Sequence, residues 1–182
     1  MNKAKEILLP AVVLFLISVI VTAALAGTNA LTKDTIAQLA QESQAQAMSR
    51  VIEADTFTQD EGERDGESFT YNTALLEDEP VGYVFVTAAS GYGGDVSVMT
   101  AVDLQGTILA VEVLSVADET PGLGANAAKS EWWAQFAGMS GELAVNKDGG
   151  EVDALTGATI TSRAVTRAIN TALAQFESLE VA

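Results

Sequence analysis

One long apolar segment opens the chain. No residue between Ile7 and Thr32 is charged, and the first 20 residues of this stretch are almost all apolar. About 20 helical residues cross the roughly 30 Å hydrocarbon core of a bilayer, so residues 1–31 are predicted to form a transmembrane anchor. Lys3 and Lys5 lie on its N-terminal side. By the positive-inside rule, we expect a cytoplasmic N-terminus and an extracytoplasmic C-terminal domain at the cell membrane.

A cleaved signal peptide is the alternative interpretation of this segment. The two lysines would form its charged start, and Ala24-Leu25-Ala26 before Gly27 resembles a cleavage site. The apolar stretch is longer than the roughly 7–15 residues of such signals. A retained anchor is therefore the favoured interpretation.

Two polar stretches follow the anchor. Apolar residues recur among polar ones from Thr32 to about Ala54, which predicts a helix leaving the membrane. We assign residues 32–56 as a linker helix, with Thr32 or Asp34 as its N-cap. Residues 58–67 are polar and contain glycine, so they are predicted to be an exposed loop.

Segments rich in β-branched and aromatic residues then predict strands. The expected strands cover residues 69–76, 82–88, 96–103 and 107–116, with a hairpin turn at 104–106 and a short helix at 130–136.

The last segment has the apolar spacing of a helix with one buried face. Its apolar positions are Val165, Ala168, Ile169, Ala172, Leu173 and Phe176. Thr161 or Ser162 is the expected N-cap. Strands followed by helices indicate an α+β domain over residues 57–182, with a mainly antiparallel sheet and flanking helices.

Composition narrows the chemistry. Beyond Thr32 there are 7 Lys and Arg against 24 Asp and Glu, a net charge of −17. So acidic a body repels phosphate backbones, which argues against nucleic-acid binding. The chain has no Cys and no His, which excludes iron–sulfur clusters, c-type haem and the usual zinc ligands. Any redox chemistry must therefore come from an organic cofactor.

The strongest chemical signal lies just before the final helix. Residues 152–162 hold four hydroxyl side chains and two very small residues, Gly157 and Ala158. The free N–H groups and dipole of a helix N-terminus form an anion site. Small residues there let a phosphate, or the active site of another enzyme, approach closely. The plainer interpretation is that the hydroxyls cap the helix and Asp153 starts a turn.

Two other loops and a tryptophan pair are weaker candidates. Residues 119–124 place Pro and then Gly at the centre of a type II turn, whose amides could bond a heterocycle; an ordinary tight loop has the same composition. The Gly-rich residues 90–95 lack the Lys and following helix of a P-loop, which favours a hairpin loop over a ligand contact. Trp132 and Trp133 could wall a flavin ring, fill the core or meet a partner.

Together these segments resemble the FMN-binding family that comprises RnfG, of Rnf complexes, and NqrC, of sodium-pumping NADH:quinone reductases. The resemblance covers roughly the whole chain: the N-terminal span, Gly91-Tyr92-Gly93-Gly94, the 119–124 loop, and Asp153 followed by Thr156-Gly157-Ala158-Thr159. The modest length favours RnfG. The family often has a His shortly before the 119–124 loop, where this chain has Ala117-Asp118.

The resemblance implies covalent FMN. It assigns the phosphoester to Thr159, formed by a flavin transferase that recognises the Thr-Gly-Ala-Thr element and its upstream Asp. The implied cofactor-binding residues are Asp153, Thr156, Gly157, Ala158, Thr159, Thr161, Ser162, Glu119, Thr120, Pro121, Gly122, Leu123 and Gly124. Backbone amides and the helix dipole are expected to stabilise the phosphate, with Lys147 as a candidate cationic neighbour.

The resulting hypothesis is an electron-transfer subunit of a membrane-bound, ion-translocating ferredoxin:NAD oxidoreductase. It implies integral membrane flavin and iron–sulfur subunits as partners, and no residue that acts as an acid, base or nucleophile in turnover. The alternatives are NqrC of a sodium-pumping quinone reductase, a freestanding extracytoplasmic flavin carrier, or a non-redox, membrane-anchored binding domain.

Overall fold

The computed structural model describes residues 3–116 and 118–180. The chain forms two compact units, Met1–Ser43 and Gln44–Ala182. Ala117, one of the two residues that stand where the family often has a His, lies outside the described residues.

Helix α1 (Lys3–Val51) is continuous. The predicted anchor and linker helix are therefore parts of one helix, within which Leu8–Ile36 is long and apolar enough to cross a membrane. The N-cap predicted at Thr32 or Asp34 is wrong. The Thr32 hydroxyl donates instead to the carbonyl of Thr28 (2.9 Å), a bond that a β-hydroxyl makes inside an uninterrupted helix.

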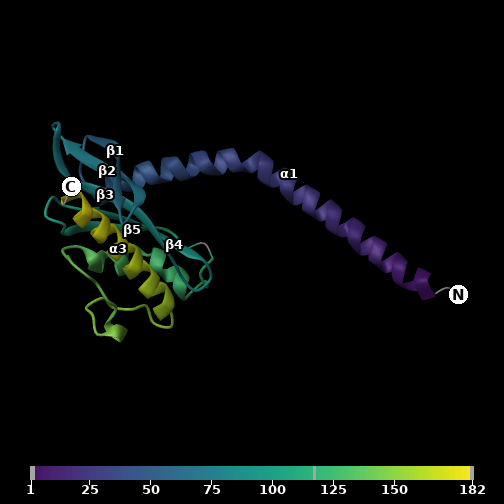
Figure 1. Ribbon diagram of the computed structural model, residues 1–182. Coiled ribbons are helices and arrows are strands. Elements are labelled where there is room, and N and C mark those ends of the chain that lie inside the picture. The colour runs from purple at the N-terminus through teal and green to yellow at the C-terminus, as the bar shows by residue number, and fades with distance from the viewer. Residues whose placement is uncertain (1–2, 117, 181–182) are drawn as a thin grey trace. The chain divides into compact units, whose positions relative to one another are not determined.

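The described part of the second unit contains a five-stranded sheet in which every neighbouring pair is antiparallel and consecutive (Figure 1). The strands are β1 (Thr56–Arg64), β2 (Glu67–Leu76), β3 (Glu79–Ser90), β4 (Asp95–Val102) and β5 (Ile108–Ser115). The four predicted strands correspond to β2–β5 and are confirmed. The predicted turn at 104–106 is confirmed too, with Gly106 at φ +79°.

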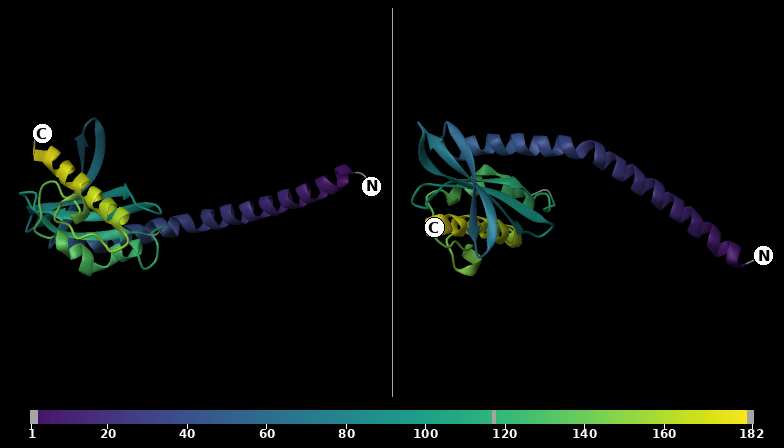
Figure 2. Two further views of the ribbon diagram at one scale, coloured as in Figure 1. Left: turned by 90° about the horizontal axis from the view of Figure 1, so that it is seen from below. Right: turned by 45° about the horizontal axis from the view of Figure 1, so that its top comes forward.

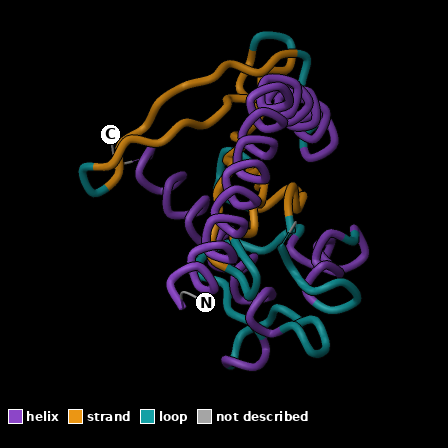
Figure 3. Tube along the Cα trace, turned by 90° about the vertical axis from the view of Figure 1, so that its right-hand side faces the viewer, coloured by secondary structure: helices purple, strands orange, loops and turns teal. Residues whose placement is uncertain are grey.

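Strand β1 replaces the exposed loop predicted at 58–67, and that prediction is wrong. All nine residues of β1 pair with β2, from Thr56 opposite Leu75 to Arg64 opposite Glu67. At an edge, backbone pairing stabilises a strand whose side chains remain largely in water. Asp65 and Gly66 turn the hairpin with φ values of 55° and 84°. Figure 3 shows this turn near the end of α3, where a Cβ on Gly62 would lie 3.0 Å from Leu179.

The two faces of the sheet bury different helices. Helix α3 (Thr159–Glu180) runs along one face (Figure 2), and its apolar positions form the main core with alternate residues of β4, including Val96, Val98 and Val102. The residues between them, Met99 and Ala101, point to the other face and pack with Ala47, Val51 and Ile52. This period-2 alternation is that of a strand covered on both sides.

Short helices fill the connection from β5 to α3. They are the 3₁₀ helix η1 (Gly124–Ala128), α2 (Ser130–Trp133), and the 3₁₀ helices η2 (Ala134–Phe136) and η3 (Asn146–Asp148). The helix predicted at 130–136 is thus confirmed as α2 and η2. An antiparallel sheet with flanking helices confirms the α+β class.

Candidate functional site

A cavity of about 570 Å³ lies where three segments meet: the β3–β4 hairpin loop, the loop after β5, and the start of α3. That volume is in the range of about 300–1,000 Å³ usual for small-molecule sites. The lining residues are Tyr92, Glu119, Thr120, Leu123, Gly124, Gly157, Ala158, Thr159, Ile160 and Thr161. The two segments with the strongest sequence signals therefore share one cavity.

The start of α3 presents backbone donors at this cavity. The Ser162 N–H donates to the Ala158 carbonyl (3.0 Å). The N–H groups of Thr159, Ile160 and Thr161 precede that bond and have no i−4 partner in the helix. Such groups, with the positive end of the helix dipole, favour an anion.

The predicted N-cap at Thr161 or Ser162 is wrong, because the helix already begins at Thr159. Both side chains serve other segments instead. The Ser162 hydroxyl accepts the N–H of Leu155 (2.9 Å) and donates to the carbonyl of Ala158 (3.0 Å). It therefore ties the loop that precedes Thr159 to the helix.

Glu119 is a buried carboxyl at the meeting point of the three segments, with 5% of its surface exposed. Its Oε1 accepts the N–H groups of Tyr92 (2.7 Å) and Gly93 (3.4 Å). Its Oε2 accepts the hydroxyl of Thr161 (2.7 Å). One side chain thus connects the β3–β4 loop, the loop after β5 and the first turn of α3.

The space around this carboxyl requires glycine. A Cβ on Gly91 would overlap Glu119 Oε1, and a Cβ on Gly124 would overlap Glu119 Oε2 and lie 2.6 Å from Thr161 Oγ1. The predicted turn is also confirmed: Leu123 N–H donates to the Thr120 carbonyl (3.1 Å), with Gly122 at φ +78°. The glycines therefore let two loops close tightly on one buried group.

Two family descriptions match this chain. The FMN-binding domain matches residues 91–174, and the RnfG N-terminal region matches residues 1–51. The G-type subunit of the Na(+)-translocating ferredoxin:NAD(+) oxidoreductase complex of Acetobacterium woodii is 34% identical over 188 residues, which cover 92% of this chain and 90% of that protein. The chain belongs to the RnfG family of ion-translocating oxidoreductase subunits.

Other proteins of the RnfG family are also similar to this chain. The G-type subunit of the ion-translocating oxidoreductase complex of Escherichia coli (strain K12) is 36% identical over 166 residues, covering 81% of this chain and 80% of that protein. Its counterpart in the proton-translocating ferredoxin:NAD(+) oxidoreductase complex of Clostridium ljungdahlii is 36% identical over 129 residues, covering 69% and 66%. Family membership and the apolar segment in α1 make this chain a membrane-anchored flavoprotein.

Solved structures share the fold. The C-type subunit of the Na(+)-translocating NADH-quinone reductase from Parabacteroides distasonis aligns with a TM-score of 0.54 at 26% identity, over 63% of this chain and 64% of that chain, slightly under two thirds. Shewanella oneidensis NqrC aligns with a TM-score of 0.53 at 22% identity, over 69% and 70%. The latter likeness concerns the fold alone.

The cavity fits the FMN that its matched domain name implies. All of its lining residues fall within the matched range 91–174. Leu123 and Ile160 provide apolar surface for a ring, the first N–H groups of α3 are free to bind an anion, and Thr159 supplies a hydroxyl beside them. Tyr92 and Ile160 were absent from the predicted site residues. Two sequence features could have pointed to them: Tyr92 lies in a Gly-rich hairpin loop, and Ile160 is an apolar residue outside the buried face of α3.

Several predicted site residues do not line the cavity: Pro121, Gly122, Asp153, Thr156 and Ser162. Their assignment to the cofactor stays a prediction. Asp153 is held by side chains of other loops, as its carboxylate accepts from Asn146 Nδ2 (2.9 Å) and its N–H donates to Gln135 Oε1 (2.7 Å). Its carbonyl accepts the indole N–H of Trp132 (2.7 Å). This hydrogen bond holds the loop that contains Asp153 against the edge of the core.

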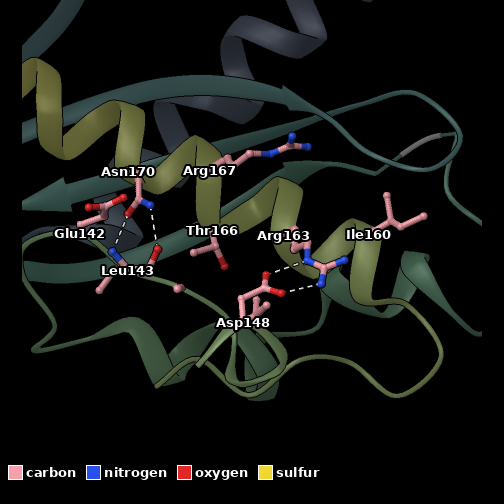
Figure 4. A pocket seen from close by; sticks show the side chains of 10 residues that line it. Glu142, Leu143, Asp148, Ile160, Arg163, Thr166, Arg167 and Asn170 are labelled. Carbon is pink, nitrogen blue, oxygen red and sulfur yellow. Dashed lines mark hydrogen bonds and ion pairs between the residues drawn. The ribbon is translucent and has the colours of Figure 1, made fainter. Parts of the chain in front are cut away.

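A second cavity of about 450 Å³ lies along the exposed side of α3 (Figure 4). Arg163 lines it and forms a two-pronged ion pair with Asp148 (2.6 and 2.7 Å), which lowers the pKa of Asp148. Arg167 also lines it and donates to the Ser90 carbonyl (2.6 Å). None of the residues lining the first cavity is cationic, and Lys147 lines neither cavity.

Proposed function

We propose that this chain carries one FMN joined through its phosphate to Thr159 Oγ1. In this role it passes electrons between other subunits of a membrane-bound, ion-translocating ferredoxin:NAD oxidoreductase. The observation that carries the proposal is the position of Thr159, which is partly exposed and lines a ligand-sized cavity inside the matched FMN-binding domain. The flavin supplies reversible electron transfer when bound, and the protein sets its orientation and potential.

The linkage is a phosphodiester, in which Thr159 Oγ1 is bonded to phosphorus with loss of one water. The N–H groups of Thr159, Ile160 and Thr161 are placed to stabilise the remaining phosphate charge. Because the cavity lining holds no cationic side chain, this stabilisation depends on backbone dipoles. A covalent tether holds the cofactor without the binding affinity that an exchangeable flavin needs.

A maturation enzyme must reach the threonine. Asp153, Thr156 and Gly157 are exposed and precede Thr159 in one loop. We propose that a flavin transferase recognises the surface of this loop. Asp153 then contributes to recognition during attachment.

A denaturing gel viewed under ultraviolet light tests the linkage. Full-length protein from cells that hold the transferase should give a fluorescent band, and intact mass should exceed the sequence mass by one FMN less one water. Thr159→Ala should be dark. Thr171→Ala is the matched control, since it removes an exposed hydroxyl from the same helix at a position that does not line the cavity, and it should keep the fluorescence. A dark wild-type band would overturn the proposal.

We infer that the N-terminus is cytoplasmic and residues 57–182 are extracytoplasmic, as the lysines before the anchor indicate. The chain has no native Cys, so single cysteines report topology without background. A membrane-impermeant maleimide should label Glu63→Cys in intact cells. It should label Ala4→Cys only after lysis. The reverse pattern would contradict this orientation.

The expected partners are integral membrane subunits that carry flavin and iron–sulfur centres. This chain has no Cys, so any iron–sulfur cluster of the complex lies in another subunit. Mild detergent extraction of a tagged chain, expressed at its natural level, should recover such subunits. Recovery of a quinone-reducing complex instead would favour the NqrC alternative.

A further inference from the structure

Glu119 places a buried negative charge in a cavity that must also hold a phosphate. Its carboxyl accepts three hydrogen bonds, two of them from backbone N–H groups that can only donate. No cationic side chain is among the residues that line the cavity. Dipoles therefore stabilise the carboxylate, and among the described residues it forms no ion pair.

Such a charge does not assist phosphate binding, since like charges in a cavity of low dielectric repel. Burial of an unpaired carboxylate also costs free energy. A neutral amide of the same shape could make the same three contacts: its oxygen would accept both N–H groups, and its Nε2 would donate to the Thr161 hydroxyl. The shape of the site therefore does not require a charged residue at position 119.

We propose that Glu119 is a positioning residue whose charge lowers the reduction potential of the bound FMN. The proposal rests on FMN occupying this cavity. Each electron added to the flavin brings negative charge toward the carboxylate, which opposes reduction. Charges within about 10 Å of each other in a partly buried site interact strongly enough to change an equilibrium roughly tenfold.

The Thr161 hydroxyl and the two loop amides moderate this effect. They direct positive dipole ends at the carboxylate and hold it at a fixed place beside the cavity. Removing one donor should leave the charge less compensated, so that reduction becomes harder. Two substitutions at one contact, Glu119→Gln and Thr161→Val, are therefore expected to move the potential in opposite directions.

The test is a redox titration of the purified full-length flavoprotein, followed by its visible absorbance. Glu119→Gln should keep the fluorescent gel band and a near wild-type melting temperature. At a fixed potential, its ratio of reduced to oxidised flavin should rise roughly tenfold. Thr161→Val should lower that ratio. Glu131→Gln removes the same charge from an exposed position on α2 and should change nothing.

A Glu119→Gln protein with intact flavin and the midpoint of Glu131→Gln would overturn the proposal. If Glu119→Gln fails to fold or to take up flavin, Thr161→Val decides, because an unchanged midpoint there equally overturns it. Failure of the FMN assignment itself is a separate outcome, since the wild-type gel band would then be dark. If Glu119→Gln changes the melting temperature but not the midpoint potential, the carboxyl of Glu119 has a purely structural role.

Discussion

Gly124 and Thr161 approach so closely that a methyl group on Gly124 would lie 2.6 Å from the Thr161 hydroxyl. Ordinary contacts of a Cβ are longer by several tenths of an ångström, so the loop after β5 and the first turn of α3 meet with no spare space. The cavity wall is consequently sensitive to a single added methyl.

Gly124→Ala should lower the free energy of unfolding by about 1–3 kcal/mol through overpacking. It should also reduce the fraction of chains that carry flavin, because the methyl displaces Glu119 and Thr161. Gly122→Ala is the matched control in the same turn: nothing lies within 4 Å of its added Cβ, and only its positive φ costs about 1–2 kcal/mol. Denaturant unfolding and gel fluorescence measure both. Equal flavin content in the two variants would contradict the steric account.

Two isoleucines of α3 should behave differently. Ile169 is fully buried, whereas Ile160 is 47% exposed and lines the cavity. Ile169→Ala should cost about 2–5 kcal/mol of folding free energy. Ile160→Ala should stay within about 0.5 kcal/mol but alter the visible spectrum of the bound flavin. Chemical denaturation and absorbance separate the two effects, and similar stability losses would contradict the assigned burial.

Asp148 should give stability a weak dependence on acid. Its hydrogen bond from Arg163 lowers the pKa of its carboxyl in the folded state. The ion pair therefore stabilises the fold above the ordinary Asp pKa of about 3.9, and this contribution is lost as pH falls through the lowered folded-state value. Wild type and Asp148→Asn should differ slightly in melting temperature at pH 7 and converge in acid. A difference that grows in acid would contradict this sign.

Truncation should locate the boundary of the folded domain. Ala47, Val51 and Ile52 are buried against the sheet, and Arg50 forms an ion pair with Glu112 (2.5 Å). A chain of residues 44–182 should fold and melt cooperatively without detergent. A chain of residues 57–182, which starts at the boundary predicted from sequence, should lose several kcal/mol because Met99 and Ala101 become exposed. Equal melting of the two chains would support the boundary at 57.

Local patterns explain which parts of the fold were predictable. Strands β2–β5 are rich in β-branched and aromatic residues, and α3 repeats its apolar residues at helical spacing, so the local sequence predicts each element. The local sequence does not predict strand β1, because an edge strand can be polar along its whole length and still pair through its backbone. The Asp65-Gly66 turn was the available signal, as this dipeptide favours the tight turn of a hairpin.

The predictable parts of the site are those whose residues are neighbours in the sequence. The Thr-Gly-Ala-Thr element and the Pro-Gly turn are contiguous in sequence, and both reach the cavity through Thr159 and Thr120. The role of Glu119 was not predictable from the residues, since its hydrogen-bond partners lie 26 to 42 positions away. Assigning Thr161 as a helix cap failed for the same reason, because a distant carboxylate accepts its hydroxyl.

The cavity walls come from residues 92 to 161, and the core that supports them is completed by α3, the last element of the described chain. During translation, the sheet therefore emerges from the ribosome before the helix that covers it. A nascent or prematurely terminated chain would have an uncovered apolar sheet and no finished pocket. FMN binding in this pocket is accordingly expected only late in biogenesis, once α3 has been synthesised.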